Sequence, residues 1–316
     1  MDNCTTFEEV DFEVPNYFRY YRSGRVERLA GTAIVPPSLD PITGVESRDV
    51  VLDSSTAVSA RLYLPLSISI SSIDNRKLPV VVYFHGGGFC IESAASPTYH
   101  HHLNVLTALT PLLAVSVDYR LAPEHRLPAA YDDGWTALHW VLSRSDPWVA
   151  RHGDLRQVFL AGDSAGANIA HQVAMRAAGK GLRLKGLALV HPFFWGSEPV
   201  GFEPADPVFR ARMNQRWWFT CPGAVGPDDP RWNPTGEAAP SLAGLGCERV
   251  LVTVAEMDYL KHRGRLYYEK LKASGWKGEA ELVETAEEGH VFHLREPESA
   301  KALAQLRLLA AFLGRE

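Results

Sequence analysis

Eight short apolar runs, with helical patterns between the later ones, constrain the fold of this chain more than any other feature. Strands that alternate with helices are typical of β-α-β crossovers, which build a mostly parallel sheet with helices on its faces. The first two runs have no helix between them, so we expect an antiparallel start to the sheet. The expected strands are 48–52, 59–64, 78–84, 113–117, 158–161, 186–190, 250–254 and 280–284.

Length and composition fit one domain over residues 1–316. The chain has 316 residues, 46% of them hydrophobic, and a net charge of −5, so it is long enough to bury a sizeable core. It has no block of lysine or arginine and therefore lacks the electrostatic signature of nucleic-acid binding. It also has no run of 18 apolar residues, so we expect no membrane span.

The cysteines and the N-terminal residues indicate the cellular compartment in which the protein is expected. Cys4, Cys90, Cys221 and Cys247 lie far apart and form no CxxC pair, which argues against a metal site or a disulfide framework. The acidic first residues lack the apolar core of a signal peptide. We therefore expect a soluble protein of the cytoplasm, with or without the nucleus. The sequence gives no indication of oligomeric state.

Two segments break the alternation, at about 1–45 and about 192–248. Both contain prolines and aromatic residues. Because long irregular stretches in compact domains are usually functional, we expect them to form a small cap over one edge of the sheet. The alternative is a pair of long surface connections whose aromatic residues only pack on the core. The expected pocket residues are Phe18, Phe209, Trp217, Trp218, Tyr259 and Val291.

The pentapeptide GDSAG places Ser164 between two glycines at the end of an expected strand, with a helical pattern behind it. A sharp strand-to-helix turn of this kind exposes a serine hydroxyl in strained backbone geometry. A Cβ at Gly162 or Gly166 would clash in so tight a turn. The helix N-terminus favours negative charge beside the serine. Ser164 is thus the candidate nucleophile; the alternative is a simple helix N-cap.

The motif HGGGF, residues 85–89, follows another expected strand. Consecutive glycines let backbone N–H groups turn inward, where they can stabilise the oxyanion of acyl transfer. The candidate donors are the amides of Gly87, Gly88 and Ala165. The alternative is a flexible turn, but a glycine-rich loop upstream of a serine elbow matches the arrangement of lipases and esterases.

A serine nucleophile needs a base and a group that orients the base. In serine elbows of this type, the acid and then the histidine follow the serine along the chain. Asp258 follows the run VLVTV, and His290 lies in GHVFH, so Ser164, Asp258 and His290 are the candidate triad. Glu256 is the alternative acid and His293 the alternative base.

Five motifs together resemble plant class I carboxylesterases, in the hormone-sensitive-lipase-like branch of the α/β hydrolases. They are YFHGGGF, SVDYRLAPEHRLPAAYDD, GDSAGANIAH, VLVTVAEMD and GHVFH, and the resemblance spans nearly the whole chain. It implies an α/β-hydrolase fold with a mostly parallel eight-stranded sheet. It also implies a serine esterase that cleaves a small carboxylic ester through an acyl-enzyme, with no cofactor and no metal.

The resemblance also implies structural roles for charged residues near the motifs. Asp118, Arg120 and Glu124 would be partly buried charges that tie loops together, and His85 and Asp163 would support the site without reacting. The histidines at 100–102 form a triplet. Contiguous histidines cannot all face one metal, so we interpret them as a solvated helix face.

Three other functions occur among similar proteins. Some relatives are 2-hydroxyisoflavanone dehydratases, in which threonine can replace the serine, so Ser164 favours the esterase. Tuliposide-converting enzymes transfer the acyl group instead of hydrolysing it, and they share the acyl-enzyme. The gibberellin receptor lacks the catalytic histidine, whereas this chain has His290, which argues against a receptor.

Overall fold

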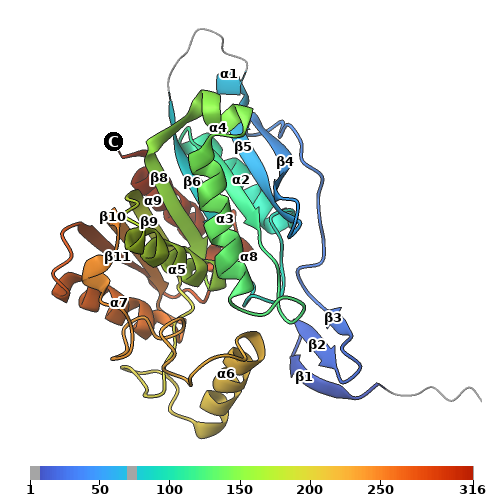
Figure 1. Cartoon of the computed structure of the whole chain (residues 1–316), viewed down its shortest axis with the longest axis vertical. Coiled ribbons are helices and arrows are strands. Elements are labelled where there is room, and N and C mark those ends of the chain that lie inside the picture. The colour runs from blue at the N-terminus through green and yellow to red at the C-terminus, as the bar shows by residue number, and fades with distance from the viewer. Residues whose placement is uncertain (1–7, 70–76, 316) are drawn as a thin grey trace, which may run out of the picture.

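An eight-stranded sheet forms the centre of the computed structural model, which describes residues 8–69 and 77–315 (Figure 1). The strand order is β11-β10-β9-β8-β6-β7-β5-β4. Strand β5 runs antiparallel to both of its neighbours, and the pairs from β7 to β11 are parallel. The mostly parallel sheet and its antiparallel start are confirmed. The strands are β4 (Val45–Asp53), β5 (Val58–Pro65), β6 (Leu78–Phe84), β7 (Leu113–Asp118), β8 (Gly153–Asp163), β9 (Leu184–Val190), β10 (Cys247–Ala255) and β11 (Glu279–Thr285).

Helices cover both faces of the sheet, because side chains of its central strands are buried on both sides. On β8, Val158 and Leu160 join the core beneath α3 (Ala129–Ser143), α5 (Ala165–Gly179) and α7 (Lys261–Ala273). Phe159 and Ala161 join the core beneath α2 (Pro97–Leu109) and α9 (Ala300–Gly314). This is the alternation that an extended strand imposes. Burial of a Val, Leu or Phe side chain contributes roughly 1.5–3 kcal/mol to the free energy of unfolding. Figure 1 shows α3 and α5 in front of the sheet and α9 behind it.

The main helices are α2 (Pro97–Leu109), α3 (Ala129–Ser143), α5 (Ala165–Gly179), α6 (Pro207–Thr220), α7 (Lys261–Ala273) and α9 (Ala300–Gly314). Shorter helices are α1 (Leu66–Ser69), α4 (Pro147–His152) and α8 (Phe292–Arg295), with a 3-10 turn at Leu242–Gly244. In the two described stretches of the chain, no helix has both the length and the apolar character needed to cross a membrane.

A second, three-stranded antiparallel sheet lies in the N-terminal segment, where the sequence predicted no strands. It consists of β1 (Val10–Val14), β2 (Phe18–Tyr21) and β3 (Val26–Arg28). Its aromatic residues pack on α6: the Phe219 ring stacks on Phe12 at 4.2 Å and lies 5.6 Å from Phe18. The two segments that break the alternation are therefore in contact. We call β1–β3 together with α6 the small module; both parts lie at the lower end of Figure 1.

Two ion pairs and a hydrogen bond connect this module and the neighbouring loops. Arg28, at the end of β3, donates to both carboxylate oxygens of Glu124, at 2.8 and 2.7 Å. Arg120 donates to both carboxylate oxygens of Asp133 on α3. The carboxylate of Asp118 accepts from the backbone N–H of Ala94. All three charges of the DYRLAPEH segment thus connect loops, but Glu124 is exposed and not partly buried as expected.

The histidine triplet on α2 does not form a solvated face. His102 is only 5% exposed, and the half-buried His100 ring lies 3.1 Å from the hydroxyl of Tyr63. His101 is the exposed member. The expectation failed because α2 packs closely on the sheet, so adjacent residues 100 degrees apart around the helix reach different surroundings.

Candidate active site

The turn from β8 into α5 holds Ser164 in a strained conformation, with φ 52° and ψ −117°. The backbone of β6 packs directly against this turn. A Cβ on Gly166 would lie 2.0 Å from the carbonyl oxygen of Phe84, and one on Gly162 would lie 2.6 Å from the same atom. Only glycine fits at both positions, so the surrounding backbone imposes the turn that presents the serine hydroxyl.

Ser164, His290 and Asp258 form a continuous hydrogen-bonded line. The Ser164 Oγ lies 2.8 Å from His290 Nε2, and His290 Nδ1 lies 2.6 Å from Asp258 Oδ2. Asp258 follows β10, and its other carboxylate oxygen accepts from the backbone N–H of Leu260 at 2.9 Å. With the proton on Nδ1, the imidazole donates to the carboxylate and can accept from the serine hydroxyl.

The surroundings of Asp258 keep it ionised. Burial acts to raise the pKa of Asp258, but the hydrogen bond and charge of His290 outweigh burial and lower that pKa. The alternative acid, Glu256, is exposed and accepts from the backbone N–H of Glu287. The alternative base, His293, is buried, and neither of its ring nitrogens has a hydrogen-bond partner in the described part of the chain. The structure thus brings the triad residues together, and neither alternative takes part in their hydrogen bonds.

The glycine loop after β6 lies beside the serine. Gly87 and Gly88 have φ of 96° and 61°, and a Cβ on Gly87 would meet the carbonyl oxygen of Ile91 at 2.2 Å. Ala165 is the first residue of α5, where a backbone N–H has no partner within the helix. Among the loop, turn and cap hydrogen bonds of the described residues, none uses the N–H of Gly87, Gly88 or Ala165. These three donors remain available for an oxyanion.

Buried polar residues fix this loop from behind. The hydroxyl of Tyr119 donates to the carbonyl oxygens of His85 and Gly86, at 2.8 and 3.0 Å. The Tyr119 ring stacks on the His85 ring with 4.2 Å between centroids. Burial lowers the pKa of His85 to about 4, so this imidazole is neutral at pH 7. His85 therefore packs and positions the loop.

Asp163 connects the serine turn to the glycine loop. Its carboxylate accepts from the hydroxyls of Tyr83 and Tyr99, at 3.0 and 2.9 Å. The Tyr99 hydroxyl in turn accepts from the backbone N–H of Gly86 at 2.7 Å. Burial raises the pKa of Asp163 to about 6 even though both hydroxyls act to lower it. Asp163 therefore supports the site through its hydrogen bonds to Tyr83 and Tyr99.

One group of residues has the spacing of metal ligands. Ligand atoms of His191, Asp258 and His290 lie within 4.8 Å of one another. The His290 nitrogens, however, face Asp258 and Ser164, and His191 Nδ1 accepts from the backbone N–H of Val291 at 2.9 Å. Burial lowers the pKa of His191 to about 3. Hydrogen bonds within the triad, and the one from Val291 to His191, account for this proximity.

A cavity of about 710 Å³ opens beside the triad, and Ser164 and His290 form part of its wall. Of the expected pocket residues, Tyr259 and Val291 line it, whereas Phe18, Phe209, Trp217 and Trp218 do not. Sequence reasoning missed most of the lining. The missed residues include Tyr17, Ile91, Glu92, Phe193, Arg216 and Leu294.

Packing explains why the four aromatic residues lie elsewhere. Phe18 is 1% exposed beneath the small sheet. Trp217 stacks on Trp232 with 4.9 Å between ring centroids. Phe209 packs edge-on against Tyr259, behind the lining, and Trp218 is 47% exposed. On α6, successive side chains turn by about 100°, so Arg216 reaches the cavity and the neighbouring tryptophans do not.

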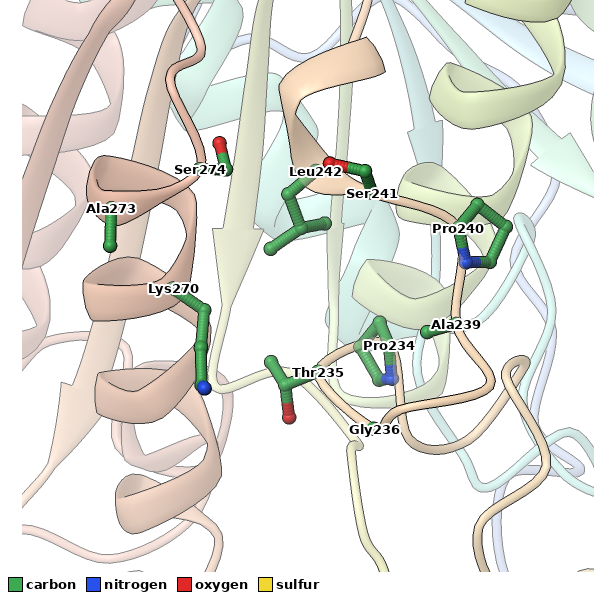
Figure 2. A pocket seen from close by; sticks show the side chains of 10 residues that line it. All are labelled: Pro234, Thr235, Gly236, Ala239, Pro240, Ser241, Leu242, Lys270, Ala273 and Ser274. Atoms are coloured by element: carbon green, nitrogen blue, oxygen red, sulfur yellow. The ribbon is translucent and has the colours of Figure 1, made fainter.

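Two further hollows lie away from the nucleophile. A cavity of about 550 Å³ adjoins the first through Thr98, Leu294 and Arg295, and it contains His102 and His293. An open groove of about 310 Å³ lies between residues 234–242 and the C-terminal half of α7. Figure 2 shows its lining side chains, with Thr235 and Lys270 on opposite sides. None of the triad residues lines either hollow.

Comparisons with known proteins agree with this geometry. A family model described as the α/β hydrolase fold matches residues 81–294. Probable carboxylesterase 2 of Arabidopsis thaliana is 47% identical over 313 residues and covers 98% of each chain. The chloroplastic tuliposide A-converting enzyme 1 of Tulipa gesneriana is 48% identical, over 98% of this chain and 79% of that protein. The crystal structure of a thermostable carboxylesterase cloned from a metagenomic library superimposes with a TM-score of 0.69. It is 31% identical, over 89% of this chain and 90% of that one.

Proposed function

The chain belongs to the α/β-hydrolase fold family, and from that premise we propose that it is a serine carboxylesterase that hydrolyses a small carboxylic ester. One observation carries the proposal. Ser164, His290 and Asp258 are joined by contacts of 2.8 and 2.6 Å, and the serine faces a cavity of about 710 Å³. A hydroxyl activated by an oriented imidazole is the arrangement that acyl transfer needs.

The geometry supports a two-step reaction. Ser164 Oγ attacks the ester carbonyl as His290 Nε2 takes its proton, and the ionised Asp258 stabilises the imidazolium. The N–H groups of Gly87 and Gly88, with that of Ala165, hold the oxyanion. Each such donor contributes about 3–4 kcal/mol to lowering the barrier. His290 then protonates the leaving alcohol, and a water molecule repeats the sequence to release the acid from Ser164.

The small module acts as the cap. Tyr17, in the turn before β2, and Arg216, on α6, both line the cavity. The two segments proposed as cap, about 1–45 and about 192–248, therefore each contribute to the substrate-facing wall. Residues 1–7, with Cys4, lie outside the described residues.

Acyl transfer to an alcohol is the second candidate. It uses the same acyl-enzyme, and the tulip relative is named for a tuliposide-converting activity. The two outcomes differ only in whether water or another hydroxyl attacks the acyl group. A dehydratase would need His290 as a base without a covalent step, but His290 is already in contact with the Ser164 hydroxyl.

The test is covalent labelling with a serine-directed organophosphate, combined with turnover of p-nitrophenyl acetate. We expect one label per chain and loss of turnover in parallel. Ser164→Ala should abolish labelling and lower kcat at least about a thousandfold, with the remaining rate due to the oxyanion donors. Ser143→Ala, an exposed serine on α3, is the control and should retain both. Labelling and turnover that persist in Ser164→Ala would contradict the proposal.

We also propose that the protein works in the reducing cytoplasm. Among the described residues, Cys90, Cys221 and Cys247 are buried free thiols. Burial raises the pKa of Cys90 to about 12, which keeps it a thiol and unreactive. A fluorescent fusion at the C-terminus tests this: diffuse cytoplasmic signal supports the proposal, and plastid signal contradicts it.

A further inference from the structure

The cavity wall contains a charged side chain that the esterase mechanism leaves unused. Arg216, on α6, lines the cavity together with Ser164. Its Nη2 atom lies 3.0 Å from the position that a Cβ on Gly88 would occupy. The guanidinium therefore stands directly beside a residue whose N–H is assigned to the oxyanion. A group bound there would be only a few bonds from the reacting carbonyl.

This guanidinium has no acceptor among the described residues. In the described stretches of the chain, no hydrogen bond or ion pair involves it, and its buried Nε has no partner. Its Cζ lies 5.9 Å from the centroid of the Phe193 ring. A buried donor without an acceptor is rare in native structures and calls for an explanation.

Neighbouring arginines behave differently. Arg263 donates to the carboxylate of Glu203, and Arg210 donates to backbone carbonyls of Gly196 and Ser197. The segment around α6 thus supplies acceptors for arginines that stabilise it, but none for Arg216. The contrast indicates that Arg216 is oriented toward something that enters the cavity.

Two carboxylates also line the cavity, and neither one pairs with Arg216. Asp163 is occupied by the hydroxyls of Tyr83 and Tyr99. Glu92 is within ion-pair distance of no described arginine. The other arginine in the wall, Arg295, is exposed at its rim. Arg216 is therefore the half-buried cation available to an incoming anion.

We propose that Arg216 is a specificity-determining residue that binds a carboxylate of the substrate. The inference rests on the proposed esterase function and names its substrate class: esters with a carboxylate a few bonds from the reacting carbonyl. The planar guanidinium can donate two parallel hydrogen bonds to a carboxylate. The carboxylate can belong to either side of the ester bond, as in a monoester of a short dicarboxylic acid or an ester of a hydroxy acid.

The experiment compares carboxylate esters with uncharged esters of the same shape. On the acyl side, monomethyl glutarate is matched by methyl 5-methylhexanoate. On the alcohol side, 4-acetoxybutanoate is matched by 4-methylpentyl acetate. Acid release at pH 7.5 gives kcat/KM for each, and the readout is the ratio of the carboxylate ester to its isostere.

We expect Arg216→Met to lower this ratio about ten- to hundredfold for one of the two pairs, mainly through KM, because a charge-assisted hydrogen bond is lost. Arg216→Lys keeps the positive charge but loses the planar guanidinium that donates two parallel hydrogen bonds. Its ratio should lie between those of the wild type and Arg216→Met. Arg212→Met is the matched control, since Arg212 is exposed one turn earlier on the same helix. It should leave the ratio unchanged.

A ratio that stays within about threefold of wild type in Arg216→Met, for both pairs, overturns the proposal. The esterase function survives that result if the wild type still hydrolyses p-nitrophenyl acetate and is labelled at Ser164. It fails separately if the wild type shows neither. If Arg216→Met does not fold, as judged by its melting temperature, Arg216→Gln replaces it and the same ratio decides.

Discussion

The serine turn and the small module both form walls of one cavity, but they are built differently. Around Ser164, backbone packs on backbone so closely that a single Cβ at Gly162 or Gly166 would overlap the strand beside it. In the small module, β1 has no fully buried residue. On α6 only Met213, Trp217 and Thr220 are buried. The chemistry is thus held by a dense core, and the substrate wall by a few side-chain contacts.

This difference has a functional consequence. A densely packed site has one conformation, so a substitution there changes the reaction itself and should appear in kcat. A sparsely packed wall can shift without unfolding the sheet, so a substitution there should appear in KM and in the choice of ester.

The largest effect is expected at Asp258. Asp258→Asn should lower kcat about ten-thousandfold, because an amide at this position favours the wrong tautomer of His290. KM should change little, since Asp258 is not part of the cavity lining. Steady-state kinetics with p-nitrophenyl acetate measures both parameters.

Glu256→Gln is the matched control, because Glu256 lies two residues earlier and, among the described residues, its carboxylate accepts only from the backbone N–H of Glu287. It should retain kcat within about twofold, as expected of an exposed residue away from the reaction. If Glu256→Gln instead abolished turnover and Asp258→Asn did not, the acid would have to be reassigned.

The site around Ser164 could be predicted from the sequence because it depends on local backbone geometry. Glycines around Ser164, three glycines after β6, and an acid and a histidine after later strands are each typical of the serine elbow, the oxyanion loop and the triad of such a site. For the same reason, all eight strands of the large sheet fall where apolar runs predict them.

The structure of the small module could not be predicted from the sequence in this way. Its strands β1–β3 are short and partly exposed, so they lack a distinct apolar pattern. Aromatic residues were expected to face the substrate, yet Trp217 and Phe18 are buried in packing, while Arg216 lines the cavity. Which face of α6 meets the cavity depends on how the helix docks, and a single sequence does not encode that in a local pattern.

A smaller effect is expected from the pH dependence of stability at Asp163. Its pKa is raised from 3.8 to about 6, so between these values the folded state binds more protons than the unfolded state. The free energy of unfolding should therefore fall as pH rises from about 4 to about 6, by about 3 kcal/mol from this residue. Asp163→Asn should remove this part of the slope in urea unfolding at pH 4, 5, 6 and 7.

Tyr83→Phe sharpens the measurement, because the Tyr83 hydroxyl acts to lower the pKa of Asp163. Without that hydrogen bond, the loss of stability should extend to higher pH. A wild type and an Asp163→Asn variant with parallel stability curves over this range would show that the carboxyl titrates alike in both states. Burial in the dense core would then not shift the pKa of Asp163.

The smallest effect is expected in the small module, at Phe219. Its ring joins α6 to the N-terminal sheet by stacking on Phe12 at 4.2 Å. Phe219→Ala removes aromatic contacts of roughly 0.5–1.5 kcal/mol each and should loosen the wall formed by Tyr17 and Arg216. KM for p-nitrophenyl esters with bulky acyl groups should rise about fivefold relative to acetate, while kcat for acetate stays close to wild type.

Trp218→Ala tests whether this effect depends on the joint between the two parts of the module. Trp218 precedes Phe219 on α6 but is 47% exposed, so its removal should leave the selectivity unchanged. A Phe219→Ala variant with a lowered kcat for every ester would mean that the small module helps to hold the triad. The two walls of the cavity would then act as one packed unit, and the distinction between them would fail.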